Sequence, residues 1–441
     1  MTVVRPYTGP DPGHPVTVVP SDPSRRGALV RVRGWEVAVA DPVGAVTDGR
    51  ALDEAADDLR WAGPAAAGPP FTHGLLGFVT DDASAALLDL DTVDERPAPA
   101  PLPPLWFGRY THAACQSPDG RWWVTGASDA DADRAHSLLV AAARRHGRPR
   151  APGRAGVVGD TPHEESARST LSRPQHGAAV QRIHDWIADG DVYQVNLTLH
   201  VGARWDGTPR ALARRLFGAS PSADHAAFLH APGATIASVS PETFLRMDGR
   251  QATIRPIKGT RRRAEDPVVD RALAEDLRTA TKDGAEHVMI VDLERNDLGR
   301  ICEVGSVRVP QLMELEAHPT VWHLTSTVLG TVRADLGLRD VLAALFPCGS
   351  VTGAPKRMAV SRTRLVEPWR RGVYCGAIGV IAPGLVDLSV AIRTAVLHDG
   401  WAWYGTGGGI VADSDPDEEW EEAMTKASAF FTATGTAPPG G

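Results

Sequence analysis

Two pairs of carboxylates are separated by a spacing that could serve metal binding. Asp283 and Glu286 are three residues apart in one helical pattern, and Glu419 and Glu422 are three residues apart in another. Residues with this spacing share one face of a helix. Carboxylate oxygens from two converging helices suit Mg²⁺, a hard cation that prefers oxygen ligands. Solvated helix faces, with acids favoured in a first turn by the helix dipole, are the more common explanation of such spacing.

Two cations lie in apolar or turn-like surroundings. Arg393 interrupts the apolar run 390–396, where a charge is usually paired or faces a ligand. Lys258 follows a strand-like segment and precedes Gly259 and Thr260. The ordinary alternative for each cation is a side chain that extends along apolar surface to reach solvent. These two residues are therefore candidates for binding an anionic ligand.

A glycine run, 405–409 (GTGGG), lies between a predicted strand and a helix that begins near Asp415. Such glycines let the backbone approach a ligand closely and present N–H groups to an anion. The run has neither the dinucleotide nor the P-loop spacing, so nucleotide binding is disfavoured. A tight turn from strand to helix explains the glycines at least as well. Nearby candidates have ordinary explanations too, because His323 is more often a satisfied histidine and Tyr374 more often a core residue.

The elements that must position these residues are read from periodicity and turn signals. Apolar positions 180, 183, 186 and 187 predict a helix that Gly190 ends, and alternation over 195–201 predicts a half-buried strand. Asp-Gly pairs at 248–249 and 399–400 predict hairpins of 243–247 with 251–257 and of 386–397 with 401–411. Further helices are predicted over 283–295 and from 415–416 onward. Hairpins with interspersed helices indicate an α+β fold with antiparallel sheet.

Composition restricts the class of protein. The 441 residues contain 43% hydrophobic and 23% charged residues, as in ordinary globular proteins. A formal net charge of −8 disfavours nucleic acid as a partner, because phosphates call for a basic surface. The four cysteines form no CxxC pair, and neither a signal peptide nor an apolar membrane span is evident. We therefore expect a cytoplasmic protein that has no membrane or nucleic-acid partner.

Two segments predict breaks in the organisation of the chain. Residues 97–104 (PAPAPLPP) should be extended, and residues 146–175 are polar with little apolar periodicity, which predicts a flexible loop. The loop separates an N-terminal part, 1–145, from a C-terminal part, 176–436. Length alone allows either two domains or one domain with an inserted loop.

Blocks of residues in the C-terminal part occur in the order found in the chorismate-utilising enzymes. The sequence closely resembles this family, which includes anthranilate, aminodeoxychorismate, isochorismate and salicylate synthases. The matching blocks are 190–200 (GDVYQVNLTLH), 240–246 (SPETFLR), 255–263 (RPIKGTRRR), 286–302 (EHVMIVDLERNDLGRIC), 322–326 (WHLTS), 349–356 (GSVTGAPK), 374–379 (YCGAIG), 391–395 (AIRTA) and 404–427 (YGTGGGIVADSDPDEEWEEAMTKA). The N-terminal part matches more weakly, around 74–82 (GLLGFVTDD).

The resemblance implies one α+β unit in which two large antiparallel β-sheets pack together with helices outside. It implies that Glu286 and Glu422 bind Mg²⁺, with Asp283 and Glu419 close by, and that the ion holds the ring carboxylate of chorismate. It further implies a general acid, Glu242, and two residues that line the site, His323 and Thr352. The remaining implied contacts to substrate carboxylates or backbone are Tyr374, Arg393, Gly259, Thr260, Gly407, Gly408, Gly409 and Lys426.

Two positions distinguish the subfamilies. Lys258 stands where anthranilate and isochorismate synthases typically carry alanine, and in aminodeoxychorismate synthases it resembles a nucleophile that attacks C2 of chorismate. Gln194 stands where water-using relatives carry a lysine base, so isochorismate and salicylate synthesis are disfavoured. An attacking Lys258 must be neutral, which burial or the nearby cations Arg255, Arg261 and Arg262 would favour.

The resulting hypothesis is an enzyme of the aminodeoxychorismate synthase component I type. It would convert chorismate and ammonia into 4-amino-4-deoxychorismate, and the ammonia would come from a separate glutamine amidotransferase subunit, since no amidotransferase motif is evident. The alternatives are anthranilate synthase component I and a non-catalytic chorismate- or tryptophan-binding subunit. The resemblance leaves open whether the product would serve folate synthesis through p-aminobenzoate or an antibiotic pathway.

Overall fold

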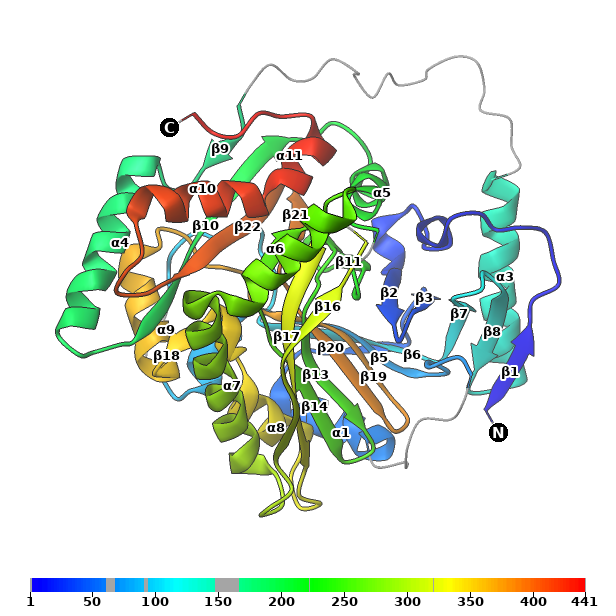
Figure 1. The fold of residues 1–441 in the computed structure, drawn as a ribbon. Coiled ribbons are helices and arrows are strands. Elements are labelled where there is room, and N and C mark those ends of the chain that lie inside the picture. Colours follow the sequence, from blue (N-terminus) through cyan, green and yellow to red (C-terminus); the bar gives the residue numbers. More distant parts are fainter. Residues whose placement is uncertain are drawn as a thin grey trace.

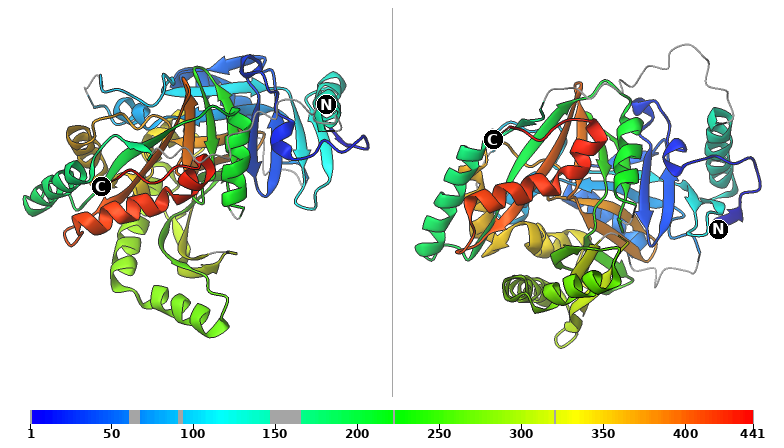
Figure 2. Two further views of the ribbon diagram at one scale, coloured as in Figure 1. Left: turned by 90° about the horizontal axis from the view of Figure 1, so that it is seen from above. Right: turned by 45° about the horizontal axis from the view of Figure 1, so that its top comes forward.

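Strands from the N-terminal and C-terminal parts combine into two antiparallel sheets (Figure 1). The computed structural model describes residues 2–60, 68–90, 94–146, 166–221, 223–319 and 321–440. Within these ranges the sheets lie face to face and helices cover their outer sides (Figures 1 and 2). The predicted α+β fold of two packed antiparallel sheets is therefore confirmed.

The first sheet contains the glycine run. Its strands, in spatial order over the described residues, are β1 (Val3–Pro6), β8 (Trp122–Gly126), β7 (His112–Gln116), β3 (Trp35–Val39), β2 (Ala28–Val32), β11 (Ala227–Ala231), β12 (Ala234–Ser238), β21 (Thr394–His398), β22 (Trp401–Ile410), β10 (Gln194–Arg204) and β18 (Gly353–Ala354), with β9 (Arg168–Ser169) also paired to β10.

The second sheet contains Lys258. Its strands are β15 (Ile257–Arg262), β17 (Val321–Thr331), β14 (Gln251–Arg255), β13 (Thr243–Asp248), β20 (Leu385–Val390), β19 (Ala377–Ala382), β5 (Gly74–Val79), β6 (Leu105–Tyr110) and β4 (Gly44–Val46), with β16 (Arg308–Ala317) paired to β17. Both the 1–145 and the 176–436 parts thus contribute strands to each sheet.

The helices of the described residues occupy the outer faces and the edges of the sheets. They are α1 (Gly49–Arg60), α2 (Ser84–Leu87), α3 (Asp129–His146), α4 (Arg173–Ala188), α5 (Pro209–Ala219), α6 (Pro267–Thr279), α7 (Thr281–Ile301), α8 (Leu338–Leu345), α9 (Lys356–Val366), α10 (Pro416–Lys426) and α11 (Ser428–Thr434), with short 3-10 turns η1 (Pro15–Thr17), η2 (Pro23–Arg25), η3 (Asp81–Ala83) and η4 (Gly349–Val351). Helices α6 and α7 project from the body together with β16 and β17 (Figure 2). No helix among the described residues is both long and apolar enough to cross a bilayer.

Alternating side chains divide the core into layers. In β2, Val30 faces the other sheet while its neighbour Leu29 packs under the helices. In β19, Ile378 and Val380 face the first sheet, whereas Ile381 joins the core under α1 and α8. A strand that is covered on both faces buries its polar positions as well as its apolar ones.

Strand β10 illustrates this double coverage. The sequence predicts a half-buried strand, but Asn196, Thr198 and His200 are buried together with their apolar neighbours. The half-buried interpretation is therefore wrong for these positions. Because α4 and α9 cover one side of β10 and the rest of the fold covers the other, its polar residues are available only to internal partners.

The predicted helices are confirmed, with longer bounds than the patterns gave. Helix α4 covers the 180–187 stripe, α7 covers 283–295, and α10 begins after Asp415, whose carboxylate accepts the backbone N–H groups of Asp417 and Glu418. The predicted loop 146–175 lies mostly outside the described residues, and the described end of it already contains β9 and the start of α4.

The two hairpins differ in outcome. Strands β13 and β14 pair as predicted. In the second case, only β21 and β22 form the hairpin, because the predicted strand 386–397 divides into β20 of the second sheet and β21 of the first. The chain thus passes from one sheet to the other within a few residues.

Candidate functional site

The glycine run lies inside strand β22, so neither a ligand-binding turn nor a strand-to-helix turn is formed there. A Cβ on Gly405 would overlap the ring of Tyr374, and a Cβ on Gly407 would overlap the backbone of Leu197 in the neighbouring strand. A Cβ on Gly408 would come 2.8 Å from Oε2 of Glu419. The glycines therefore let an aromatic ring, a neighbouring strand and helix α10 approach the same stretch of backbone.

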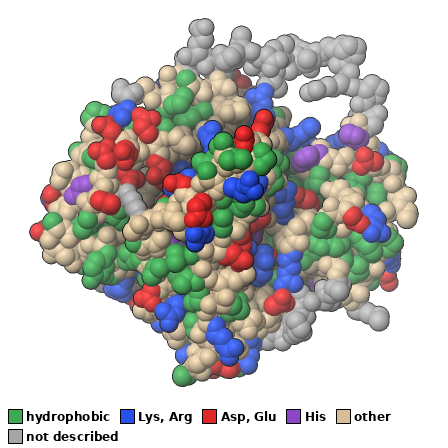
Figure 3. Space-filling view, viewed as in Figure 1, with side chains coloured by type: hydrophobic (Ala, Val, Ile, Leu, Met, Phe, Trp, Pro, Cys, Tyr) green, Lys and Arg blue, Asp and Glu red, His purple; other side chains and the backbone are tan. Residues whose placement is uncertain are grey.

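Helix α10 is attached to this stretch by Lys426. Its Nζ atom donates to the carbonyl oxygen of Gly407 at 2.9 Å and pairs with Oε1 of Glu422 at 2.6 Å. Glu419 is buried on the same helix, and its Oε1 accepts a hydrogen bond from Ser414 at 2.7 Å. Glu419 and Lys426 thus lie against β22, and Glu422 is held beside them by its pair with Lys426. Acidic side chains also gather on the surface over α10 (Figure 3).

The other acidic pair, on α7, lies beside β15. Oδ2 of Asp283 is 3.2 Å from Nη2 of Arg261, and a Cβ added to Gly259 would lie 3.3 Å from Asp283. Glu286 is one turn further along and is half-buried. No group of three or more histidine, cysteine or acidic side chains has metal-binding proximity among the described residues. The chemistry of the four carboxylates fits a hard divalent cation, and Mg²⁺ binding remains a prediction.

Strand β15 carries Lys258, Gly259 and Thr260. Lys258 is half-buried, and Gly259 has a positive φ of 78°, which a residue with a side chain rarely adopts. The hydroxyl of Thr260 lies 3.0 Å from Nδ1 of His323 on the adjacent strand β17. His323 is buried, and burial together with the charges of His318 and Arg393 lowers its pKa to about 4. A neutral His323 imidazole therefore orients Thr260 at neutral pH.

Two of the three cations predicted beside Lys258 have carboxylate partners of their own. Arg255 pairs with Glu316, and Arg261 pairs with Asp276 at 2.6 Å as well as with Asp283. Arg262 is exposed. Carboxylates therefore compensate two of the three charges.

Glu242 is the most strongly perturbed acid near Lys258. It lies in the segment between β12 and β13, is 5% exposed, and its Oε1 has no hydrogen-bond partner within the protein. Burial raises its pKa to about 7, while a hydrogen bond from Ser350 and the charge of Lys258 act in the opposite direction. A carboxyl group with these properties is protonated over a substantial fraction of molecules at neutral pH and can act as a general acid.

Arg393 lies in the short link between β20 and β21 and has a φ of 49°, so the prediction that it interrupts a strand is wrong. The left-handed conformation occurs where the chain crosses from one sheet to the other. Arg393 and His323 line a common cavity of about 80 Å³ together with Asp224 and Pro241. The cavity thereby brings together Arg393 of the link between the sheets and His323, a predicted site residue of the second sheet.

Tyr374 and Thr352 are buried beside an extended polar network. The Tyr374 ring packs edge-on against His200, with 6.1 Å between ring centroids. The Thr352 hydroxyl donates to the Cys348 carbonyl oxygen at 2.7 Å, and this bond closes the turn around η4. The described contacts therefore give Thr352 a local structural bond, and its predicted part in the site remains a prediction.

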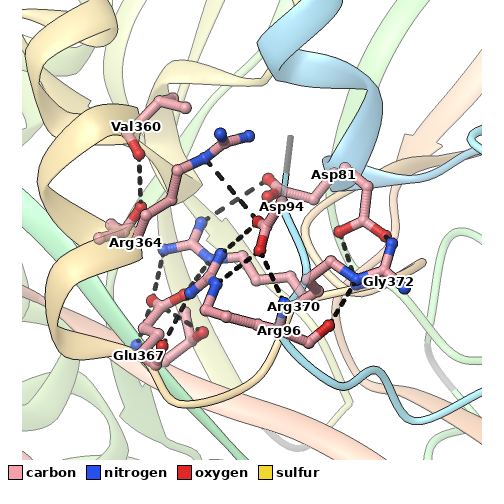
Figure 4. A network of polar contacts seen from close by, with 12 residues as sticks. Asp81, Asp94, Arg96, Val360, Arg364, Glu367, Arg370 and Gly372 are labelled. Carbon is pink, nitrogen blue, oxygen red and sulfur yellow. Dashed lines mark hydrogen bonds and ion pairs between the residues drawn. The ribbon is translucent and has the colours of Figure 1, made fainter. Parts of the chain in front are cut away.

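The polar network fixes the segments that carry these two residues (Figure 4). Arg371 is 4% exposed, and its guanidinium donates to Glu367 at 2.8 Å, to the Val351 carbonyl at 3.0 Å and to the Asn196 carbonyl at 2.7 Å. The backbone carbonyl of Glu367 in turn accepts a hydrogen bond from Arg96. The network thus connects β10, the η4 turn and the segment that precedes Tyr374.

Sequence reasoning missed several buried polar residues close to the site. Glu294 on α7 and Cys348 before η4 are hydrogen-bonded to each other, with Sγ and Oε1 3.5 Å apart. His287 lies beside Glu286 and its Nε2 is 2.6 Å from the Ser326 hydroxyl. No periodic signal identified them, because an acid or histidine in a helix is most often solvated and only its tertiary position shows burial.

Comparisons with known proteins show the family and the fold of this chain. The family model described as chorismate binding enzyme matches residues 37–432. Anthranilate synthase component 1 of Thermus thermophilus is 37% identical over 84% of this chain and 79% of that protein. Aminodeoxychorismate synthase component 1 of Salmonella typhimurium is 40% identical over 60% of this chain, and the chain spans 58% of that relative, less than two thirds. The crystal structure of anthranilate synthase component I from Streptococcus pneumoniae TIGR4 superposes with a TM-score of 0.73 and 27% identity, covering 98% of this chain and 92% of that one.

Proposed function

This chain belongs to the chorismate binding enzymes, and we propose that it joins ammonia to C4 of chorismate to form 4-amino-4-deoxychorismate. Chorismate loses its C4 hydroxyl as water in this reaction, and the nitrogen of ammonia takes the vacated position. The observation that carries the proposal is the pairing of a lysine with a buried acid. Lys258 is near enough for its charge to act on the Glu242 carboxyl, whose buried Oε1 has no hydrogen-bond partner within the protein.

In the proposed sequence, Glu242 donates its proton to the departing C4 hydroxyl while the neutral Lys258 amine forms a bond to C2. Ammonia then forms a bond to C4, and the Lys258 nitrogen leaves C2 as the ring double bonds return. A covalent route divides one difficult displacement into two easier steps. Arg393 and Tyr374 are proposed contacts for the enolpyruvyl carboxylate. Further proposed substrate contacts are Gly407, Gly408, Gly409 and Lys426, whose Nζ atom donates to the Gly407 carbonyl oxygen.

Mg²⁺ is the proposed cofactor, with Glu286 and Glu422 as its ligands and Asp283 and Glu419 close by. The ion would hold the ring carboxylate and draw electron density from the ring. Arg261 and Lys426 compensate one acid of each pair in the ligand-free chain. The protein's own part is to bring the two carboxylate pairs to the β15 and β22 sides of the site.

The second candidate is the anthranilate synthase reaction, in which ammonia enters at C2 and pyruvate leaves. The relative from Thermus thermophilus, which aligns over 84% of this chain, carries the name anthranilate synthase component 1. Lys258 supports the first candidate, because the resemblance places alanine at this position in anthranilate synthases. The identity of the nitrogen-bearing product therefore decides between the two.

The experiment combines product identification with variants of Lys258. The purified chain is incubated with chorismate, Mg²⁺ and an ammonium salt, and products are identified by mass spectrometry. We expect 4-amino-4-deoxychorismate, with its formation largely lost in Lys258→Ala and in Lys258→Arg, because a guanidinium remains protonated and cannot attack carbon. Arg262→Ala, which removes an exposed cation of the same strand, should retain turnover.

The test for a covalent intermediate on Lys258 omits ammonia. Chorismate and Mg²⁺ alone should leave an adduct on the peptide that contains Lys258. Anthranilate as the product would establish the second candidate. Unchanged chorismate under all conditions would indicate a binding subunit without catalysis. An active Lys258→Arg variant that forms no adduct would remove Lys258 from the covalent route.

A further inference from the structure

A second buried carboxyl lies behind Glu242 and has no part in the proposed reaction. Glu294 belongs to α7 and is 1% exposed. Its Oε1 accepts hydrogen bonds from the backbone N–H of Gly349 at 3.1 Å and from Sγ of Cys348 at 3.5 Å. Burial of an acid with only these neutral donors on Oε1 is energetically costly.

Groups with exchangeable protons lead from Glu294 toward Glu242. Sγ of Cys348 lies 3.2 Å from Oγ of Ser350, and either atom can donate to the other. The Ser350 hydroxyl also acts on the Glu242 carboxyl and lowers its pKa. Cys348 is 2% exposed and Ser350 is 7% exposed, so bulk water has little access along this path.

Charges surround the chain on each side. Lys356 of α9 and Asp297 of α7 form an ion pair whose charges act on Glu294, and the charge of Lys258 of β15 acts on Glu242. Burial raises the pKa of Glu294 to about 7, Lys356 opposes the shift, and the charges of Asp297 and Glu242 add to it. Burial also raises the pKa of the Cys348 thiol well above its usual range, so this group stays protonated. Because like charges repel in a buried site, simultaneous ionisation of Glu242 and Glu294 is disfavoured.

We propose that Glu294 is a positioning residue that stores the proton for Glu242 and returns it through Cys348 and Ser350. The role rests on the proposed function, in which Glu242 gives its proton to the departing hydroxyl. Ser350 then passes its hydroxyl proton to Glu242, Cys348 passes its thiol proton to Ser350, and Glu294 passes its carboxyl proton to Cys348. One proton moves from Glu294 to Glu242, and Cys348 and Ser350 end as they began.

A merely structural Glu294 would hold the η4 turn through its bond to Gly349. Glutamine preserves that bond, because its amide oxygen also accepts an N–H donor, but it carries no acidic proton. Glu294→Gln therefore separates storage of a proton from support of the turn. Cys348→Ala breaks the chain while leaving the Glu294–Gly349 bond, and Cys348→Ser restores a hydroxyl at the same place.

The kinetic test measures kcat for chorismate amination together with urea unfolding midpoints. We expect Glu294→Gln and Cys348→Ala each to lower kcat about tenfold with KM little changed, as for loss of proton transfer. The double variant should fall no further than either single variant. Cys348→Ser should recover most of the loss in Cys348→Ala. Cys115→Ala, which alters a buried cysteine of strand β7, serves as the control for stability effects.

A kcat for Glu294→Gln equal to that of the wild type would overturn the inference, as would losses that track the unfolding midpoint in all the variants including Cys115→Ala. Additive losses in the double variant would contradict a single chain.

A spectroscopic test requires no chorismate. The infrared band of protonated carboxyls is followed against pH in wild type, Glu294→Gln and Glu242→Gln, and the Asp81 carboxyl, whose pKa burial raises to about 7, contributes equally to all three. Difference spectra should show two coupled titration steps for Glu242 and Glu294 in the wild type. Each variant should show a single step, at a pH below that of the upper wild-type step. Independent single steps in the wild type would overturn the inference even if the amination product forms. Formation of anthranilate would overturn the proposed function and leave these spectra unchanged.

Discussion

The Nζ atom of Lys356 lies 2.6 Å from Oδ2 of Asp297, and both side chains are less than a tenth exposed. Nζ also donates to the carbonyl oxygen of Leu345 at 2.8 Å. The pair joins the first turn of α9 to α7, and α7 also packs against the η4 turn. Its position beside Glu294 makes it a structural support for the site rather than a surface ion pair.

Removal of this lysine should be costly. Lys356→Met leaves Asp297 charged and buried, and we expect a loss of about 3–5 kcal/mol in the free energy of unfolding. Lys356→Met combined with Asp297→Leu should recover part of that loss. Urea denaturation provides the measurement. Arg295→Met, which breaks an exposed i,i+3 pair with Asp292 on the same helix, should cost less than about 1 kcal/mol. Equal effects of the two single variants would contradict the assignment.

Gly405 should be intolerant of a methyl group. Gly405→Ala forces the Tyr374 ring away from β22, and we expect a destabilisation of about 1–3 kcal/mol together with weaker chorismate binding. Gly299→Ala is the matched control, because this glycine lies within α7 with no atom near an added Cβ. That variant should be stabilised by about 0.5–1 kcal/mol. Denaturation and chorismate titration of both variants test the prediction, and a Gly405→Ala protein as stable as Gly299→Ala would refute it.

His176 should make the fold sensitive to acid. It is 1% exposed and packs against Trp420, and burial lowers its pKa from 6.5 to about 4. The unfolded chain therefore binds more protons than the folded chain between these values, and stability falls as pH drops below 6.5. At pH 5 this proton linkage lowers the free energy of unfolding by about 2 kcal/mol relative to neutral pH.

His176→Phe should abolish this contribution. When the pH is lowered from 7.5 to 5, the free energy of unfolding of the wild type should fall by about 2 kcal/mol more than that of the variant. His136→Phe, at an exposed position of α3, is the control and should show no such trend. A pH-independent difference for His176→Phe would show that this residue does not titrate with unfolding.

The metal prediction concerns neighbouring acids of α10. If Glu422 binds Mg²⁺, chelation should abolish turnover, and Glu422→Gln should weaken Mg²⁺ binding at least about tenfold. Glu421→Gln is the control, because Glu421 instead pairs with Arg173 of α4 at 2.9 Å. Calorimetric titration of both variants checks the assignment. Full turnover in excess chelator, or equal Mg²⁺ affinity in the two variants, would remove Glu422 from the metal site.

The source of nitrogen follows from the cysteines. All four are buried, and burial raises the pKa of Cys115 to about 12 and of Cys302 to about 11. Attack on glutamine requires an accessible thiolate. The chain alone should therefore use ammonium salts, best at raised pH where ammonia is unprotonated, and should leave glutamine intact. Glutamate release from glutamine by the purified chain would contradict this prediction.

The sequence by itself determined the fold class and the identity of most candidate residues. Local signals were sufficient for α4, α7 and α10, because caps and 3.6-residue periodicity are properties of a single segment. The order of short blocks identified the family, because each block retains the residue types that its chemistry needs. Spacing also placed Asp283 with Glu286 and Glu419 with Glu422 on single helix faces.

Only the tertiary structure decided how these residues meet. The crossing between sheets at Arg393, the glycines as packing positions in β22 and the burial of β10 all depend on elements distant in sequence. Glu294 was not recognised for the same reason. An acid within a helix has the same local pattern whether it faces water or a second carboxyl, and its chemistry changes only when the surrounding fold removes the water.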